Sequence, residues 1–183
     1  MGIAGRSAVI LAALCIFLGI APAAVHDGQH DFDFEFGTWH ARLSRLLHPL
    51  SGSHEWTQYS GTSVVHPLWK GRANVGEFDV RGPAGHIRGM TLRLYHPQSG
   101  RWSIYWANAK DGVLTSPLVG AFKDGRGEFT DKETFDGRPI LARFIFSKVT
   151  PHAFRLTQSY SADAGKTWEA NWIADFTRQR SAT

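Results

Sequence analysis

Cysteine is almost absent from this chain: its 183 residues contain one, Cys15. Cys15 lies in an N-terminal segment that we expect to be removed, so the mature chain would have no disulfide, no thiolate nucleophile and no cysteine ligand for a metal. Stability must therefore come from a hydrophobic core. About 160 mature residues are enough for one domain with a substantial core.

A long membrane-spanning hydrophobic run is also lacking. The N-terminal apolar run, from Ala8 to Ile20, is shorter than the about 20 residues that an uninterrupted span needs. Arg6 precedes this run, and Ala21-Pro22-Ala23-Ala24 follows it with small residues suited to cleavage. This pattern predicts a signal peptide over residues 1–24. We therefore expect an exported protein, periplasmic or secreted, with no stable membrane span after cleavage.

Charge of one sign is not concentrated anywhere. The net charge of +4 comes from 20 Lys and Arg against 16 Asp and Glu, and the basic residues are spread among acidic ones such as Asp131, Glu133 and Asp136. A nucleic-acid-binding domain normally gathers its basic residues into a patch with a recognisable motif. No nucleic-acid partner is expected, and the sequence indicates no oligomeric state.

Helical amphipathicity is missing from the body of the chain. Short β-rich segments alternate instead with turn sequences such as Lys70-Gly71, Asp124-Gly125 and Asp136-Gly137. Strands separated by turns at such regular spacing favour an antiparallel sandwich or barrel. We predict an all-β fold, a single antiparallel up-and-down β-barrel of about ten strands over residues 34–179.

The segment before the barrel is polar. Residues 25–33 are rich in His and Asp and are predicted to be a flexible mature N-terminus. The alternating Phe32, Phe34 and Phe36 that follow are predicted to form a short plug against one end of the barrel.

Alternation along the predicted strands assigns their side chains to two faces. We expect the apolar rows to face inward. These rows are Met90, Leu92 and Leu94; Trp102, Ile104 and Trp106; Phe154, Leu156 and Tyr160, with Gln158 in phase; and Trp168, Ala170, Trp172, Ala174 and Phe176, with Arg178 in phase.

The two ends of the barrel region carry a matching signature. Gly37-Thr38-Trp39 opens the first predicted strand, and Phe176-Thr177-Arg178 closes the last one. The chain resembles the calycin superfamily of lipocalin and fatty-acid-binding-like β-barrels, in which such an arginine lies on such a tryptophan and caps the barrel floor. It also resembles a bacterial family of uncharacterised calycin-like proteins, through segments such as Trp102-Ser103-Ile104-Tyr105-Trp106. The resemblance implies a fold and transfers no catalytic residue.

One local motif has a structural interpretation. Ser161-Ala162-Asp163-Ala164-Gly165-Lys166-Thr167-Trp168 matches the Asp-box pattern. Its aspartate would accept hydrogen bonds from the turn amides, and its glycine would permit a positive φ. A propeller would repeat this motif once per blade, whereas here it occurs once. We interpret it as a supporting hairpin turn.

A few polar residues fall in the predicted apolar rows. Asn74 and Gln158 would each need a hydrogen-bond partner inside the barrel, and Gln58 shares a face with Trp56. Polar groups among aromatic ones are typical of a small-molecule pocket. The leading hypothesis is therefore a barrel that binds a small apolar or aromatic ligand. Its predicted ligand-binding residues are Trp56, Gln58, Asn74, Trp106, Gln158 and Trp172; the alternative is a packed core in which the polar groups bond to backbone or water.

Two other hypotheses remain open. A cofactor-independent enzyme could act in the same cavity, with Glu77 or Tyr105 as proton-transfer groups, although no catalytic motif identifies catalytic residues. An envelope interaction module would instead show an exposed apolar patch and a filled barrel.

No cofactor or metal site is predicted from the nine histidines. Haem binding would need one imidazole facing the cavity. The conceivable candidates, His96 and His152, both lie beside prolines in predicted loops. His26 and His30, with the nearby aspartates, are interpreted as part of a solvated terminus rather than as metal ligands.

Overall fold

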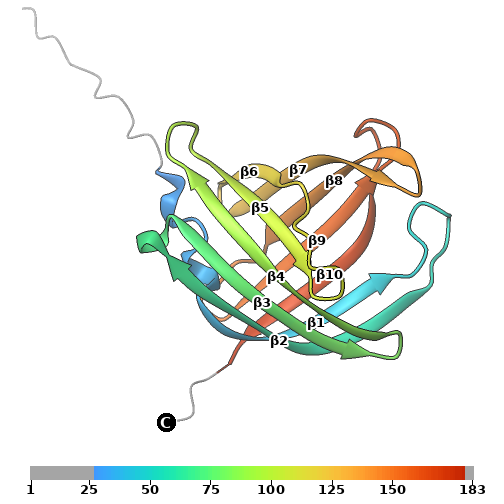
Figure 1. Ribbon diagram of the computed structural model, residues 1–183, viewed down its shortest axis with the longest axis horizontal. Helices are drawn as coiled ribbons and strands as arrows, with labels where there is room; N and C mark the ends of the chain where they lie inside the picture. The colour runs from blue at the N-terminus through green and yellow to red at the C-terminus, as the bar shows by residue number, and fades with distance from the viewer. Residues whose placement is uncertain (1–26, 180–183) are drawn as a thin grey trace, which may run out of the picture.

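The computed structural model describes residues 27–179, in which ten antiparallel strands close into one barrel (Figure 1). Consecutive strands pair with one another, and β1 (Gly37–Leu46) also pairs with β10 (Glu169–Arg178), which closes the barrel. The other strands are β2 (Trp56–Leu68), β3 (Ala73–Gly82), β4 (Gly85–His96), β5 (Arg101–Asn108), β6 (Leu118–Lys123), β7 (Arg126–Phe135), β8 (Arg138–Ser147) and β9 (Ala153–Ser161). The predicted up-and-down barrel is confirmed, and the predicted signal peptide lies outside the described residues.

Two tight turns explain why the middle strands pair with their neighbours. Asp124-Gly125 joins β6 to β7 with φ angles of 51° and 74°, and Asp136-Gly137 joins β7 to β8 with φ angles of 49° and 74°. Two successive residues with positive φ are typical of a type I′ turn, whose twist matches that of the flanking strands. These Asp-Gly pairs therefore direct the chain straight back into the sheet.

Arg178 closes one end of the barrel together with Trp39. The two residues are paired between β10 and β1, and the guanidinium carbon lies 4.1 Å from the centroid of the Trp39 ring. The guanidinium also donates to the backbone carbonyls of Phe34 and Phe36, each over 2.7 Å. The predicted contact between the two chain ends is confirmed, and it ties the segment before β1 to the last strand.

The segment before β1 fills this closed end. It forms two 3₁₀ turns, η1 (Gly28–His30) and η2 (Asp33–Glu35). Between them, Phe32 is fully buried and packs edge-on against Trp102, with ring centroids 5.0 Å apart. The Trp102 indole N–H donates to the carbonyl of Gly28 over 2.8 Å.

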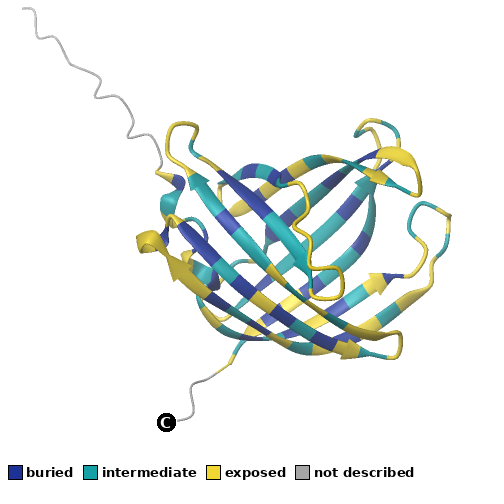
Figure 2. Cartoon of the chain, viewed as in Figure 1, coloured by how far each residue is buried: buried dark blue, intermediate teal, exposed yellow. Residues whose placement is uncertain are grey.

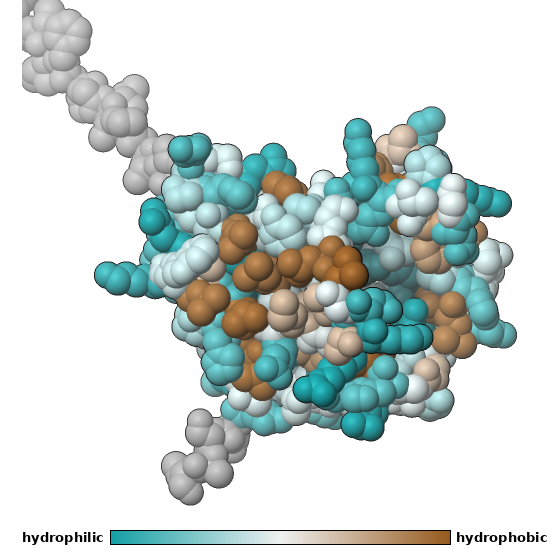
Figure 3. Space-filling model, in the orientation of Figure 1, coloured by the Kyte–Doolittle hydropathy of each residue, from teal (hydrophilic) through white to brown (hydrophobic). Residues whose placement is uncertain are grey.

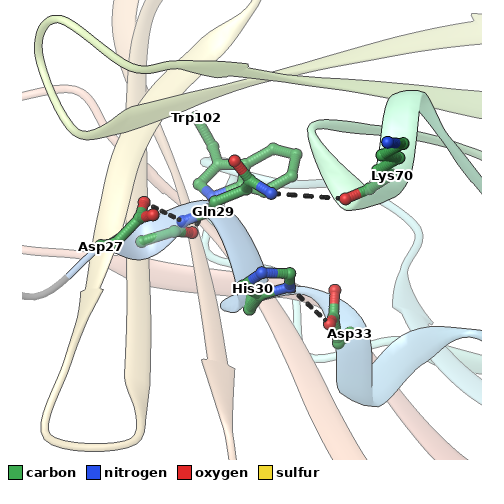
Figure 4. Close-up of polar contacts among 7 residues, drawn as sticks. Asp27, Gln29, His30, Asp33, Lys70 and Trp102 are labelled. Atoms are coloured by element: carbon green, nitrogen blue, oxygen red, sulfur yellow. Dashed lines mark hydrogen bonds and ion pairs between the residues drawn. The ribbon is translucent and has the colours of Figure 1, made fainter.

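Polar contacts fasten the outer side of this plug (Figure 4). Gln29 Nε2 donates to the carbonyl of Lys70 over 3.3 Å, and His30 Nδ1 lies 2.8 Å from Asp33 Oδ2. The segment predicted to be a flexible terminus, residues 25–33, is therefore packed against the barrel from Gly28 onward. Its local composition is polar, but the buried Phe32 side chain anchors it to the core.

A buried ion pair lies beneath the plug. Glu35 is 1% exposed and Arg93 5% exposed, and Arg93 Nη1 lies 2.7 Å from Glu35 Oε2. Arg93 Nη1 also donates to Asn74 Oδ1 over 2.9 Å. Burial raises the pKa of Glu35, and the nearby Arg93 cation opposes that rise. Since a guanidinium remains protonated even when buried, Arg93 supplies a fixed positive charge at the base of the barrel.

Because Arg93 of this ion pair faces inward, the inner and outer faces of β4 are the opposite of those predicted. Arg93 pairs with the inward-facing Ile104 of β5, so the row of Met90, Leu92 and Leu94 faces outward and Met90 is 39% exposed. Buried and exposed residues alternate along the strands in Figure 2. In Figure 3, apolar side chains gather on the outer face over β4 and its neighbours. The apolar row of β4 therefore belongs to the surface.

Candidate functional site

An internal cavity of about 400 Å³ lies above the ion pair. Arg93, Ser63 and Thr91 line its lower part, and Asn108 and Phe135, at the ends of β5 and β7, line the part farthest from the plug. This volume lies in the range of about 300–1,000 Å³ that is typical of small-molecule pockets. The barrel is thus closed by the plug at one end and hollow toward the other.

Aromatic side chains from separate strands form the cavity walls. The Phe78 ring centroid lies 6.2 Å from that of Trp106 and 5.9 Å from that of Trp172. These three residues come from β3, β5 and β10, so the barrel brings together groups that are far apart in the sequence. Both predicted wall residues, Trp106 and Trp172, line the cavity, as do the rings of Phe135, Phe144, Tyr160 and Phe176.

Polar groups gather at the end of the cavity away from the plug. Gln158 and Tyr160 of β9 line it, as does Glu133 of β7, which β8 separates from β9. Burial, followed by the charge of Asp131, raises the pKa of Glu133. Burial and the Glu133 charge together raise the pKa of Tyr160 to about 12, against a hydrogen bond with Gln158 that lowers it. The cavity therefore combines aromatic walls with a polar rim.

Two predicted site residues lie on the outer face of β2. Trp56 is 38% exposed, and the exposed Gln58 accepts a hydrogen bond from Ser44 Oγ over 2.9 Å. The opposite row of β2 includes the buried Tyr59 and Ser63. Assigning Trp56 and Gln58 to the inside was wrong, because both rows of this strand mix apolar and polar residues and alternation alone cannot orient it.

Asn74 is buried but stands below the cavity rather than in its wall. It is fully buried, and its side-chain oxygen accepts the hydrogen bond from Arg93. Arg93 lines the cavity and Asn74 is absent from its lining. Asn74 thus holds a floor residue in position instead of facing a ligand directly.

The two residues considered for proton transfer face outward. Glu77 borders the cavity between Gly76 and Phe78, but its side chain is exposed and alternates with that of the buried Phe78. Tyr105 pairs with Leu92 on the outer side of β5. Neither side chain is aimed into the cavity.

The histidine candidates also lie away from the cavity. His96 is exposed, and its Nε2 lies 2.9 Å from Ser103 Oγ. His152 is exposed in the turn between β8 and β9. Across residues 27–179 no three His, Cys, Asp or Glu side chains are grouped as metal ligands.

The predicted inward row of the last strand breaks at a β-bulge between Ala170 and Trp172. From Trp172 to Arg178 the row is as predicted, but Trp168 lies outside the barrel, with its ring 3.9 Å from the Arg143 guanidinium carbon. The Asp-box turn positions Trp168, since Asp163 Oδ1 accepts from the Thr167 N–H over 2.9 Å. These hydrogen bonds hold the pKa of Asp163 well below its usual range.

Sequence reasoning missed Asn171, which lines the cavity at the bulge. It also missed Glu133, which the sequence analysis names only among the acidic residues that are interspersed with the basic ones. An inward row of Asp131, Glu133 and Phe135 follows from the pairing of Phe129 with Phe144. The apolar Phe129 in the same row is the sequence signal that could have revealed the inward orientation of Glu133.

The barrel wall is least complete between β5 and β6. β6 pairs only with residues 102–104 of β5, and residues 109–117 cover the rest of β5. The Thr115 N–H donates to the Trp106 carbonyl over 2.8 Å, and Thr115 lines both the cavity and a groove on the outside of the barrel.

Comparison with known proteins supports the fold. No family model and no curated protein matches the sequence. The structure is similar to the S-type phycobiliprotein lyase CPES from Guillardia theta, with a TM-score of 0.60 and 12% identity over 86% of this chain and 95% of that one. It is also similar to Rv2717c from M. tuberculosis, with a TM-score of 0.55 and 15% identity over 85% of this chain and 99% of that one.

The fold is a calycin-like β-barrel. At these identities the similarity establishes the fold alone. The resemblance to a bacterial family of uncharacterised calycin-like proteins stays a prediction, because no family model matches. Within residues 27–179 the only helices are three-residue 3₁₀ turns, and none could span a bilayer.

Proposed function

We propose that this protein binds a small apolar or aromatic molecule inside its barrel. The observation that carries the proposal is the cavity of about 400 Å³, whose walls are the rings of Phe78, Trp106 and Trp172. Aromatic rings prefer edge-on or offset contacts at centroid distances of about 4.5–7 Å, and a flat apolar ligand would supply such contacts to all three.

The polar groups of the cavity give such a ligand an orientation. Arg93 at the base is already paired with Glu35, so the floor offers little net charge. Gln158, Tyr160 and Glu133 line the other end. An apolar ring would therefore lie toward the floor and a polar substituent toward the rim, as in pockets that combine apolar walls with a few polar groups.

A fluorescence titration tests this proposal. N-phenyl-1-naphthylamine, an uncharged probe that brightens in apolar surroundings, should bind saturably to the wild-type protein. Trp172→Ala and Trp106→Ala should each weaken binding by about tenfold or more, since each removes an aromatic contact. Trp56→Ala is the matched control, because Trp56 lies on the outer face, and it should bind like the wild type.

Thermal melting of each variant separates lost binding from lost folding. Equal affinity of the Trp56 and Trp172 variants would show that the probe binds outside the cavity. No saturable binding by the folded wild-type protein would overturn the proposal.

A cofactor-independent enzyme in the same cavity is a second candidate. The partly buried Glu133 favours it, because its charge acts on the Tyr160 hydroxyl within the cavity. Glu133 and Tyr160 are therefore the proton-transfer candidates, in place of the outward-facing Glu77 and Tyr105. Mass spectrometry of small molecules bound to the protein from its own host distinguishes the two: a binder releases its ligand unchanged. An enzyme would convert it, and Glu133→Gln would abolish the conversion while keeping the affinity.

We also propose that residues 1–24 direct export and are removed, which leaves a periplasmic or secreted protein. Cleavage there would keep intact the whole plug, which begins at Gly28. N-terminal sequencing of the protein from cell fractions tests this. A mature start near residue 24 in the exported fraction is expected, and an uncleaved chain in the cytoplasm would contradict it.

A further inference from the structure

The β-bulge in β10 gives Asn171 an unusual position. On β9, Gln158 pairs with Trp172 and Ser159 pairs with Ala170, so Asn171 has no partner across the ladder. A bulge inserts one extra residue and redirects the side chains beside it, and bulges are frequent next to functional sites. Here the consecutive residues Asn171 and Trp172 both line the cavity, whereas a regular strand would send one of them outward.

The Asn171 side chain is buried without a complete set of hydrogen bonds. The residue is 3% exposed, and among the described residues its Nδ2 has no hydrogen-bond partner. Leaving a buried donor unsatisfied costs about 1–3 kcal/mol. A cavity-lining amide N–H in this state is suited to donate to an acceptor atom of a bound molecule.

The neighbouring groups are less suited to this role. Gln158 acts on the Tyr160 hydroxyl, whose pKa it lowers. Arg93, whose Nη1 is engaged by Glu35 and Asn74, lies at the far end of the cavity. Glu133 on the same rim disfavours an anionic ligand group, because its own charge would repel it. The acceptor that fits beside Asn171 is therefore a neutral oxygen.

We propose that Asn171 is the specificity-determining residue of the cavity and that its Nδ2 donates to the oxygen of a neutral aromatic carbonyl compound. This inference rests on the proposed binding function and narrows its ligand class. The aromatic part contacts Trp106 and Trp172, and the carbonyl group lies toward the bulge.

A matched pair of probes tests the inference: 2-acetylnaphthalene carries the carbonyl oxygen, and 2-ethylnaphthalene has nearly the same shape without it. Their affinities are measured by displacement of N-phenyl-1-naphthylamine. One hydrogen bond has a net value of about 0.5–1.5 kcal/mol, so the wild type should prefer the ketone by about 2- to 12-fold. Asn171→Leu should remove this preference and leave the affinity for 2-ethylnaphthalene unchanged or higher.

Gln58→Leu is the control variant. It also replaces an amide by leucine, but Gln58 is exposed on the outer face of β2. The variant should therefore keep the preference for the ketone. If Asn171→Leu fails to fold, Asn171→Ala decides, since it supplies no side-chain donor.

Side-chain amide NMR gives a readout without mutation. The Asn171 Nδ2 protons should shift on addition of 2-acetylnaphthalene and not on addition of 2-ethylnaphthalene. Equal affinity of the wild type for both probes, or a preference that survives in the Asn171 variants, would overturn the inference. Failure of the wild type to bind either probe would instead contradict the proposed function itself.

Discussion

The ion pair between Glu35 and Arg93 allows a quantitative test of how the closed end is built. Arg93→Met keeps a long unbranched side chain but removes the cation. The Glu35 carboxyl, 1% exposed, then loses a partner 2.7 Å away, and Asn74 Oδ1 loses its donor. Removing one member of a buried pair costs about 3–5 kcal/mol, because the other charge stays buried. We expect the free energy of unfolding to fall by that amount.

The loss should depend on pH through Glu35. Burial raises the pKa of Glu35 and Arg93 opposes the rise, so in Arg93→Met the folded-state pKa lies further above the unfolded value of about 4.3. A carboxyl with a raised folded-state pKa favours folding below the unfolded pKa, and this contribution is lost as the pH rises through the folded pKa. The difference between wild type and variant should therefore be smaller at pH 4 than at pH 7.

Urea unfolding followed by tryptophan fluorescence measures both effects, provided that the slope of the transition is unchanged. The control is the double variant Glu35→Leu with Arg93→Met, which replaces the whole pair by apolar groups and should recover most of the stability. A loss of less than about 1 kcal/mol in Arg93→Met would contradict a stabilising role for this buried pair. A double variant no more stable than the single one would contradict it too.

Three further predictions concern other parts of the barrel. The pKa of Tyr160 is raised to about 12, so a spectrophotometric titration should show one of the four tyrosines ionising near that pH, and a step that persists in Tyr160→Phe would contradict the assignment. Arg178→Leu removes the donor to three backbone carbonyls, those of Phe34, Phe36 and Pro151, and the contact with Trp39. It should cost about 2–4 kcal/mol in chemical unfolding, and full rescue by Arg178→Lys would argue against a role for the planar guanidinium. A Cβ at Gly120 would lie 1.9 Å from the Glu128 carbonyl oxygen, so Gly120→Ala should lower the melting temperature, and an unchanged value would show that β6 can shift.

Much of the fold follows from local sequence patterns. Alternation along β5 and β9, together with the Asp-Gly turns, predicts the strands and their antiparallel order. The Trp39 and Arg178 pair predicts which end is closed. The same alternation places Trp106, Gln158 and Trp172 on the inner face, where they line the cavity.

The errors arise where distant contacts or irregular backbone decide the outcome. The apolar row of β4 looks like a core row, but Arg93 on the other row is drawn inward by Glu35, far away in the sequence. The bulge at Asn171 ends the two-residue period of β10, so Trp168 lies outside and Asn171 inside. No local sequence pattern predicts the inward Arg93 or the bulge at Asn171, because each depends on tertiary packing.

One small aromatic molecule should occupy the cavity of each barrel. Native mass spectrometry of the protein incubated with N-phenyl-1-naphthylamine measures this occupancy. A single adduct per chain is expected, which survives in Trp56→Ala and is lost in Trp172→Ala. A wild-type protein that takes up no probe, or an adduct retained equally by both variants, would contradict it.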